Sequence, residues 1–378
     1  MHIVVAIDSF KGSATSLQAA QWVEQGIHKV APQAKVSKIP IADGGEGTVA
    51  ALTAALHGRV VAKRVTGPLG EQVDAEFGML NETTAVVEMA QASGLNLTSQ
   101  APQQAMRAST YGVGELIEAA IDEGATTIYL GLGGSASTDG GVGMAKALGV
   151  RFDTAAGEPI SCGACGLAQL AKIDVQDLDP RIQQVRIKIL SDVTNPLTGP
   201  AGAAAVYGPQ KGLTQAQVPQ VDKWLAHYAK LVASTVGQDI GALPGAGAAG
   251  GLGTGLLAFT NAKVYRGIDE ILHLVQLDAQ LTDCDLVITG EGSMDAQSLN
   301  GKAPIGIAKA AKAHGVPVVA LVGARAAELD AVYDAGIDAV WAIGLGPTSL
   351  AEALKQVQCN LTIAGETVIR AFLMKRSK

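Results

Sequence analysis

Short, mainly apolar runs recur along the chain, and the residue after each of them is an acid or a glycine. Runs of Val, Ile and Leu of this length are typical of strands buried on both faces of a parallel sheet. Ligands bind to open α/β sheets just beyond the carboxyl ends of such strands, so the loops that follow are the first candidates for a functional site. The runs are residues 3–7, 36–42, 127–130, 187–191 and 286–289.

Helical patterns alternate with strands in both terminal parts of the chain, which indicates parallel β-α-β units. The first strand is followed by a predicted helix over residues 16–29, and a second helix is expected over residues 46–56. Near the other end we predict strands over 316–322 and 339–343, helices over 305–314 and 328–335, and a last helix after Gly346-Pro347 with Thr348 or Ser349 as its N-cap.

The middle of the chain has a different pattern, because three strand-like runs follow one another without helices. This predicts antiparallel or mixed pairing. We therefore predict an α/β fold with two domains. One is a parallel-sheet α/β/α domain built from residues 1–66 and 266–378, and the other is an inserted α+β domain with a mixed sheet over residues 67–265. The central runs are residues 60–65, 73–78 and 85–89, and the helices there are 111–123 and 215–235, the second capped by Thr214.

The composition limits the classes of function. The 378 residues carry 28 basic and 35 acidic side chains, a formal net charge of −7, without the basic stripe that binds nucleic acid. No apolar stretch approaches the roughly 18 residues of a membrane helix, and the first residues lack the basic region of a signal peptide. Cys162 and Cys165 have no second pair or nearby histidine to complete a zinc site. We expect a cytoplasmic protein with no nucleic-acid or membrane partner.

Glycine is enriched, at 46 residues, and the glycines gather in the loops after predicted strands. One loop, residues 131–136, matches the GxGxxA pattern of dinucleotide-binding folds, and Asp153 lies at the spacing expected for a ribose contact. An NAD-dependent dehydrogenase of a small hydroxy acid that uses this loop from Gly131 to Ala136 is therefore an alternative function. Against it, residues 137–141 interrupt the helix that should start inside the motif. A second match, residues 245–250, does not follow a strand.

The same loops hold residues suited to phosphate and a metal. Lys11 stands just before a predicted helix N-terminus, where unpaired N–H groups and the helix dipole favour phosphate. Glycines let backbone N–H groups approach phosphate oxygens, and magnesium binds one or two carboxylates together with phosphate oxygens and water. A further carboxylate can accept the proton of an attacking hydroxyl. The acidic residues that follow predicted strands are Asp43, Glu46, Asp192, Glu291 and Asp295.

Together these motifs resemble the bacterial type I glycerate kinase family. The resemblance implies ATP-dependent phosphorylation of D-glycerate, with Mg2+, to 2-phosphoglycerate, and 3-phosphoglycerate stays open as the product. It also implies a flavodoxin-like domain from the two chain ends and a second domain with a mixed sheet, with the active site in the cleft between them. The motifs that carry the resemblance are residues 8–12, 42–48, 131–141, 191–197, 208–212, 245–251, 288–295 and 301–302.

One position departs from the family pattern. Many relatives carry an arginine after the Gly-Glu-Gly loop, and this chain has Ser293 there. If that arginine binds phosphate or carboxylate, Arg325 or Lys302 must take its place.

The resemblance leads to hypotheses for individual residues. Asp192 or Asp43 is the expected base for the substrate hydroxyl, Lys11 is a further catalytic residue, and Glu291 and Asp295 are the expected magnesium ligands. A homo-oligomer and a non-catalytic sugar-acid sensor stay open. The expected substrate-binding residues are Ser9, Lys11, Gly12, Asn195 and Arg325, and the expected ATP-binding residues are Gly133, Gly134, Ser135, Lys211, Gly247, Gly250, Gly251 and Lys302.

Overall fold

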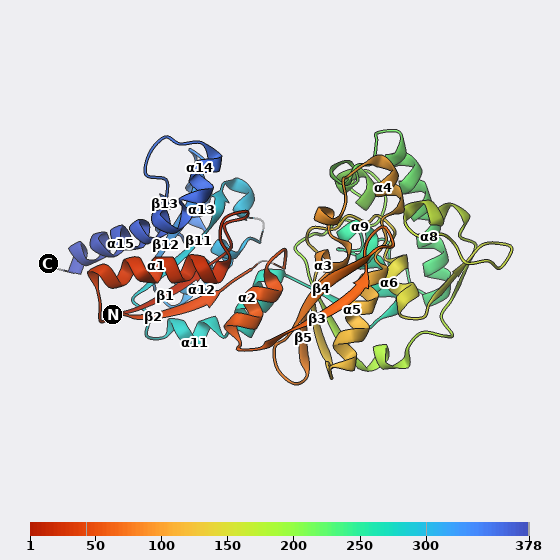
Figure 1. The fold of residues 1–378 in the computed structure, drawn as a ribbon, viewed down its shortest axis with the longest axis horizontal. Coiled ribbons are helices and arrows are strands. Elements are labelled where there is room, and N and C mark those ends of the chain that lie inside the picture. Colours follow the sequence, from red (N-terminus) through yellow and green to blue (C-terminus); the bar gives the residue numbers. More distant parts are fainter. Residues whose placement is uncertain (43, 300, 377–378) are drawn as a thin grey trace. The chain divides into compact units, whose positions relative to one another are not determined.

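A five-stranded parallel sheet is assembled from strands at both ends of the chain (Figure 1). Its strands are β1 (His2–Ile7), β2 (Lys35–Pro40), β11 (Leu286–Met294), β12 (Val318–Arg325) and β13 (Ala339–Ala342). Their order is β13-β12-β11-β1-β2, and every neighbouring pair is parallel. The computed structural model describes residues 1–42, 44–299 and 301–376. The sheet confirms the predicted parallel α/β/α architecture.

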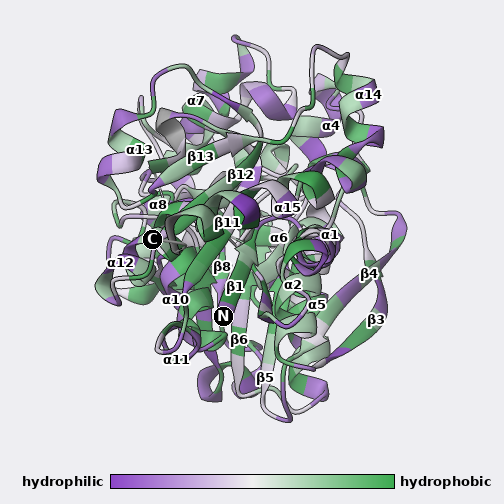
Figure 2. Cartoon of the chain, turned by 90° about the vertical axis from the view of Figure 1, so that its left-hand side faces the viewer, coloured by the Kyte–Doolittle hydropathy of each residue, from purple (hydrophilic) through white to green (hydrophobic). Residues whose placement is uncertain are grey.

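Helices cover both faces of this sheet, which belongs to a first compact unit of residues 1–43, 50–57 and 266–378. The helices are α1 (Ser16–Val30), α10 (Gly267–Leu274), α11 (Leu277–Leu281), α12 (Ala303–Ala313), α13 (Asp330–Asp334), α14 (Leu350–Lys355) and α15 (Val357–Arg376). Alternate residues of β1 pack with α1 and α15, whereas α12 contacts β11 and β1. All six residues of β1 are therefore buried. Figure 2 shows the hydrophobic strands β1 and β11 between helices with hydrophilic outer residues.

Helices α1 and α15 cross at two glycines, one on each helix. A Cβ atom on Gly26 would lie 2.0 Å from the carbonyl oxygen of Thr362 and 2.7 Å from the nitrogen of Glu366. A Cβ atom on Gly365 would lie 2.6 Å from the carbonyl oxygen of Val23. No side chain fits at these distances, so glycine at both positions lets the helix backbones touch.

The second unit, residues 44–49 and 58–265, contains a six-stranded mixed sheet. Its strands are β3 (Arg59–Thr66), β4 (Gln72–Met79), β5 (Thr84–Glu88), β6 (Thr127–Gly131), β9 (Arg186–Leu190) and β10 (Lys263–Tyr265). The order is β10-β9-β6-β5-β4-β3; β3, β4 and β5 pair antiparallel, and the remaining neighbours pair parallel. The predicted mixed sheet is confirmed. The predicted first domain extended to residue 66, but residues 59–66 form β3 here because they pair with β4 along their whole length.

The helices of the second unit surround this sheet and a smaller antiparallel pair, β7 (Arg151–Asp153) and β8 (Lys172–Asp174). They are α3 (Ala90–Ser93), α4 (Pro102–Arg107), α5 (Tyr111–Asp122), α6 (Val142–Ala147), α7 (Ala203–Tyr207), α8 (Gln217–Val236) and α9 (Ala248–Phe259), and α2 (Thr48–Ala55) begins in this unit. The N-cap residue of α8 is Ala216 and not the predicted Thr214, which lies two residues earlier and accepts a hydrogen bond from the Gln217 N–H at 3.3 Å. In the described part of the chain, no helix has the length and apolar character needed to cross a membrane.

Candidate functional site

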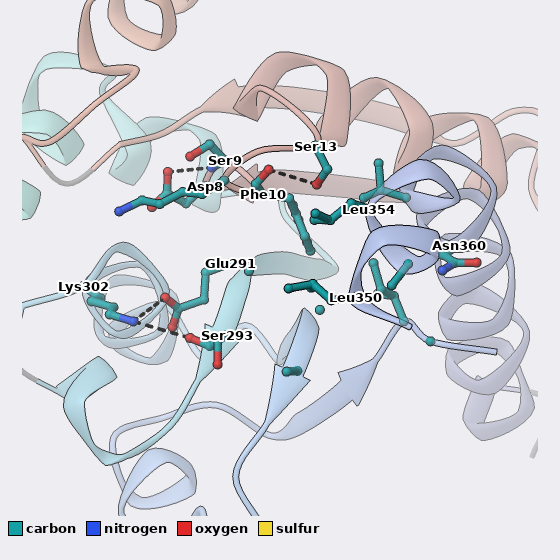
Figure 3. Close-up of a pocket in the computed structure, with 18 residues that line it drawn as sticks. Asp8, Ser9, Phe10, Ser13, Glu291, Ser293, Lys302, Leu350, Leu354 and Asn360 are labelled. Carbon is teal, nitrogen blue, oxygen red and sulfur yellow. Dashed lines mark hydrogen bonds and ion pairs between the residues drawn. The ribbon is translucent and has the colours of Figure 1, made fainter. Parts of the chain in front are cut away.

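A cavity of about 400 Å³ opens at the carboxyl ends of the strands in the parallel sheet. Residues after β1, at the ends of β11 and β12, and on α14 and the first turns of α15 line it. This is the edge at which ligands bind in open α/β sheets. Figure 3 shows Asp8, Glu291 and Lys302 on one side of the cavity and Leu350 and Leu354 on the other. The cavity therefore has a polar wall and an apolar wall.

Glu291 is the buried carboxylate of the polar wall. Its side chain is 7% exposed and accepts hydrogen bonds from Lys302 Nζ at 2.8 Å and from Ser298 Oγ at 2.7 Å. Lys302 is the N-cap residue of α12, and its ammonium also lies 3.4 Å from the carbonyl oxygen of Ser293. The pair attracts more strongly than a surface pair would, because water is largely excluded from Glu291. The positive charge is therefore held at a fixed place on the cavity wall.

Glu291 lies within a strand rather than in a loop, because β11 continues to Met294, beyond its predicted end at residue 289. Glycines on β11 and β12 make this extension possible. A Cβ atom on Gly290 would lie 1.9 Å from the carbonyl oxygen of Leu321, and one on Gly323 would lie 2.6 Å from that of Gly292. The glycines that predict a loop in the sequence thus allow two strands to approach closely.

Lys11 is exposed at the tip of a tight turn between β1 and α1. Phe10 and Ala14 close the turn with two backbone hydrogen bonds of 2.9 Å each. Gly12 has a φ of +78°, a left-handed conformation that glycine adopts without strain. Thr15 caps α1 by accepting a hydrogen bond from the Gln18 N–H at 3.2 Å, so this helix N–H is already engaged. Lys11 lines the cavity, and Gly12 shapes the turn that carries it.

Asp8 is a second carboxylate at the same edge. Its N–H donates to the Gly290 carbonyl at 2.9 Å, so Asp8 lies beside Glu291 on the neighbouring strand. Its Oδ1 accepts a hydrogen bond from the Ser9 N–H at 2.6 Å, and both Asp8 and Ser9 line the cavity. No cluster of three or more His, Cys, Asp or Glu able to hold a metal occurs among the described residues. Two carboxylates nevertheless fit magnesium, which takes its other ligands from phosphate and water.

Two residues predicted for this site lie outside the cavity lining. Asp295, expected as a metal ligand, follows β11, and its N–H donates to Ser298 Oγ at 3.3 Å. Arg325, expected to bind substrate, ends β12 and donates hydrogen bonds to the Ala326 carbonyl at 3.2 Å and to the Tyr333 hydroxyl at 3.4 Å. Of the two cations considered as replacements for an arginine at position 293, Lys302 is therefore the one at the cavity.

In the second unit, the predicted glycine loops pack against one another at the carboxyl edge of the mixed sheet. A Cβ atom on Gly250 would lie 2.0 Å from the carbonyl oxygen of Ser137, and one on Gly133 would lie 2.8 Å from the Cα atom of Gly45. The Gly140 N–H also donates to the Gly250 carbonyl at 3.1 Å. Residues 249–251 all have positive φ, at 52°, 70° and 90°. The glycines at positions 133, 140 and 250 therefore allow the loops to approach each other closely.

The predicted substrate residue Asn195 is engaged within the protein at both ends of its amide. Its Nδ2 donates to the Ala201 carbonyl at 2.7 Å, and its Oδ1 accepts from the Tyr207 hydroxyl at 2.9 Å. Its carbonyl accepts from the Gly247 N–H at 2.9 Å, which joins this loop to the glycine loops. Asp192, half-buried, lies in the same loop after β9. Asp43, the other predicted base, lies outside the described residues.

Asp139 and Lys211 hold the loop of residues 131–141 from inside. Asp139 is fully buried and accepts hydrogen bonds from the N–H and Oγ1 of Thr110, each at 2.9 Å, and from the N–H groups of Gly141 and Gly143, each at 3.1 Å. Burial raises the pKa of Asp139.

Lys211 was predicted to bind phosphate, but it is only 3% exposed. Its Nζ donates to Ser135 Oγ at 2.7 Å and to the Ser137 carbonyl at 2.6 Å. Ser135, another predicted phosphate ligand, is itself 8% exposed. In this structure the ammonium positions the loop and does not face solvent.

The buried ammonium predicts a pH dependence of stability. Burial lowers the pKa of Lys211 from 10.5 to about 7, with the Asp139 charge opposing the shift. Between these two pKa values the unfolded chain binds more protons than the folded chain, so this group makes the folded state more stable as the pH rises. We expect the slope of unfolding free energy against pH, measured by urea unfolding from about pH 7 to 10, to be smaller in Lys211→Met. Equal slopes in the two proteins would contradict the assignment.

Three acidic residues of these sites were not assigned roles from the sequence. Asp8 directly follows the first strand and begins the motif of residues 8–12, and this position after a strand is the signal in the sequence that marks it as a candidate. Asp139 sits inside the glycine motif, where nothing in the pattern reveals its burial. Glu88 ends β5 and is 3% exposed; its Oε1 accepts from the Val49 N–H at 2.7 Å near the start of α2, and burial raises its pKa.

A parallel α/β sheet with a lysine–glutamate pair and a second carboxylate at its carboxyl edge is typical of an α/β enzyme. Comparison with known proteins makes this class specific. The model of the glycerate kinase family matches residues 3–373. The chain therefore belongs to the glycerate kinase family, which confirms the resemblance in the sequence and the prediction of a phosphotransferase.

Individual relatives match over nearly their whole length. A glycerate kinase from Halalkalibacterium halodurans is 49% identical over 367 residues, 97% of each chain. The glycerate 2-kinase of Escherichia coli (strain K12) is 42% identical over 97% of each chain. A crystal structure assigned as glycerate kinase 2, from Salmonella typhimurium LT2, has a TM-score of 0.90 and 42% sequence identity, with all of both chains covered.

The alternative of an NAD-dependent dehydrogenase is not supported by these matches or by the geometry of its loop. The helix after β6 is α6, which begins at Val142, so it does not start within residues 131–136. The dinucleotide motif needs that helix N-terminus beside the pyrophosphate. The glycines of the loop instead contact neighbouring backbone.

Proposed function

We propose that this protein transfers the γ-phosphoryl group of ATP to the C2 hydroxyl of D-glycerate, giving 2-phosphoglycerate and ADP. Phosphorylation at C3 is the alternative. Family membership and the name of the Escherichia coli relative support the substrate. The observation that carries the proposal is the Lys302–Glu291 pair, held at 2.8 Å on the wall of a cavity at the carboxyl edge of the parallel sheet.

Phosphoryl transfer depends mainly on positioning and on stabilising the charge of the transferred group. Lys302 and Lys11 supply positive charge at the cavity, and Ser9 lines it beside the turn that Gly12 shapes. Asp8 and Glu291 are the residues that would hold magnesium. Mg2+, when bound, neutralises negative charge on the phosphate oxygens. Asp295 does not line the cavity, so we no longer propose it as a direct magnesium ligand.

The proton of the substrate hydroxyl must leave as its oxygen bonds to the γ-phosphorus and the bond to the β-phosphate oxygen breaks. A carboxylate is a suitable acceptor for this proton. Asp192 and Asp43 remain the proposed candidates for this base. Gly133, Gly134, Gly247 and Gly251 stay proposals for phosphate contacts. We also propose that the enzyme acts in the cytoplasm, where ATP is supplied.

The test is release of ADP, measured with a coupled assay across D-glycerate, L-glycerate and other small hydroxy acids. We expect ADP release that depends on D-glycerate. The phosphorus NMR signal of the product should be a doublet, because the phosphate of 2-phosphoglycerate is coupled to a single C2 hydrogen. A triplet would assign phosphorylation to C3. ADP release at the same rate without any acid, or ligand binding without ADP release, would overturn the proposal.

A further inference from the structure

The apolar wall of the cavity has no use in binding glycerate. Phe10, Ile343, Leu350, Leu354 and Val357 form this wall. D-glycerate is a small anion in which every carbon carries an oxygen, so its binding requires charged and hydrogen-bonding partners. A planar heterocyclic base is different, because it gains free energy when its faces leave water. Of the two proposed substrates, only the nucleotide has a part that fits this wall.

Helix α14 presents its apolar residues to the cavity. Leu350, Ala353 and Leu354 are spaced as on one helix face, and all three line the cavity. Leu350 is 76% exposed although it is large and apolar. The helix begins after Ser349, whose hydroxyl accepts from the Glu352 N–H at 3.3 Å and fixes its first turn. An exposed leucine on the wall of a cavity is a surface that a ligand can cover.

Asn360 adds a polar group to the apolar end. It lies on α15, lines the cavity and is 3% exposed. Its Oδ1 is buried without a hydrogen-bond partner among the described residues. An unpaired buried carbonyl is costly, which calls for an explanation such as a missing ligand. An asparagine amide can accept from the 6-amino group of adenine and donate to an adjacent ring nitrogen.

The two ends of the cavity match the two ends of ATP. In Figure 3, Lys302 and Glu291 lie on one side, and Leu350, Leu354 and Asn360 lie on the other. Resting on the proposed kinase function, we infer that the apolar wall holds the adenine base of ATP, with the Asn360 amide reading its 6-amino edge and the phosphates directed toward Lys302 and Lys11.

The test compares ATP with purine riboside 5′-triphosphate, which is ATP without the 6-amino group. With saturating D-glycerate, we expect the unsubstituted enzyme to prefer ATP in kcat/KM by roughly tenfold or more. In Asn360→Leu this preference should fall to near one, through a loss confined to ATP. Leucine has the same number and branching of side-chain heavy atoms as asparagine and removes the unpaired carbonyl, so the thermal midpoint of the variant should be equal to or above that of the unsubstituted enzyme.

A second variant tests the apolar wall of the cavity directly. Leu354→Trp should raise KM for both nucleotides by roughly tenfold and leave KM for D-glycerate unchanged, whereas Leu17→Trp, an exposed position on α1 outside the cavity lining, should change neither. An unchanged nucleotide preference in Asn360→Leu, or unchanged nucleotide KM in Leu354→Trp, would overturn the inference. If the unsubstituted enzyme releases no ADP with glycerate, the proposed function fails by itself. Calorimetric titration of ADP into Leu354→Trp then still decides whether the base binds at this wall, because unweakened binding would overturn it.

Discussion

Replacing Lys302 with methionine is expected to lower kcat/KM for glycerate phosphorylation by roughly 100- to 1,000-fold, the usual loss when one group that stabilises transition-state charge is removed. Lys302 is a cation on the cavity wall whose ammonium is fixed by Glu291 at 2.8 Å. Methionine keeps the length and the apolar stem of the side chain but cannot neutralise phosphate. Steady-state kinetics with ATP and D-glycerate measure the effect.

Lys309→Met is the matched control, because Lys309 is exposed on the same helix, α12, and does not line the cavity. Lys302→Met also leaves Glu291 buried without its cation, which destabilises the fold. The double variant Glu291→Gln/Lys302→Met removes that charge and should recover much of the thermal midpoint without recovering activity. Near-normal kcat/KM in Lys302→Met would exclude Lys302 from the reaction.

Asp139→Ala is expected to lower the free energy of unfolding of the second unit by about 3–5 kcal/mol, because it leaves several buried donors unpaired at a cost of about 1–3 kcal/mol each. The carboxylate accepts four hydrogen bonds, three of them from backbone N–H groups. Alanine accepts none and leaves these donors buried without partners. Urea unfolding and hydrogen exchange of the amides at Thr110, Gly141 and Gly143 measure the loss globally and locally.

Asp74→Ala serves as the control for Asp139→Ala, since Asp74 is an exposed aspartate on β4 in the same unit. Its substitution should change stability by less than about 0.5 kcal/mol. Asp139→Asn keeps one acceptor oxygen and should fall between the unsubstituted chain and Asp139→Ala. If Asp139→Ala unfolds at the same urea concentration as the control, the network does not hold the loop as described.

The sheets could be predicted from the sequence because strand burial leaves a direct pattern in the chain. β1, β2, β6 and β9 coincide with apolar runs to within a residue or two. The strand β11 was predicted too short, because its glycines resemble those of a loop. At Gly290 and Gly323, however, only glycine fits, because backbone atoms of the neighbouring strand occupy the space that a Cβ atom would need. The presence of glycine alone therefore does not distinguish a phosphate-binding loop from two strands that pack closely together.

The candidate site was predicted less completely, because burial and pairing depend on residues far apart in the chain. Lys211 has the sequence context of a phosphate-binding lysine, but its Nζ meets Ser135 and Ser137, more than 70 residues away, inside the unit. Asn360 lies in a helix without any motif, and only the cavity makes it a candidate. Glu291 and Lys302 were both candidates from the sequence, and both line the cavity, although Glu291 lies within β11 and not after it. Their roles in binding metal and phosphate stay predictions.

The sheet order has a consequence for synthesis of the chain on the ribosome. β1 pairs on one side with β2 but on the other with β11, which emerges only after the whole inserted unit. The inserted unit has its own cluster of buried side chains, so it can fold while β1 still exposes an open edge. Such an edge pairs readily with another nascent chain. β1 is thus synthesised well before its sheet can be completed, and a molecular chaperone that covers the open edge during that interval would prevent such pairing.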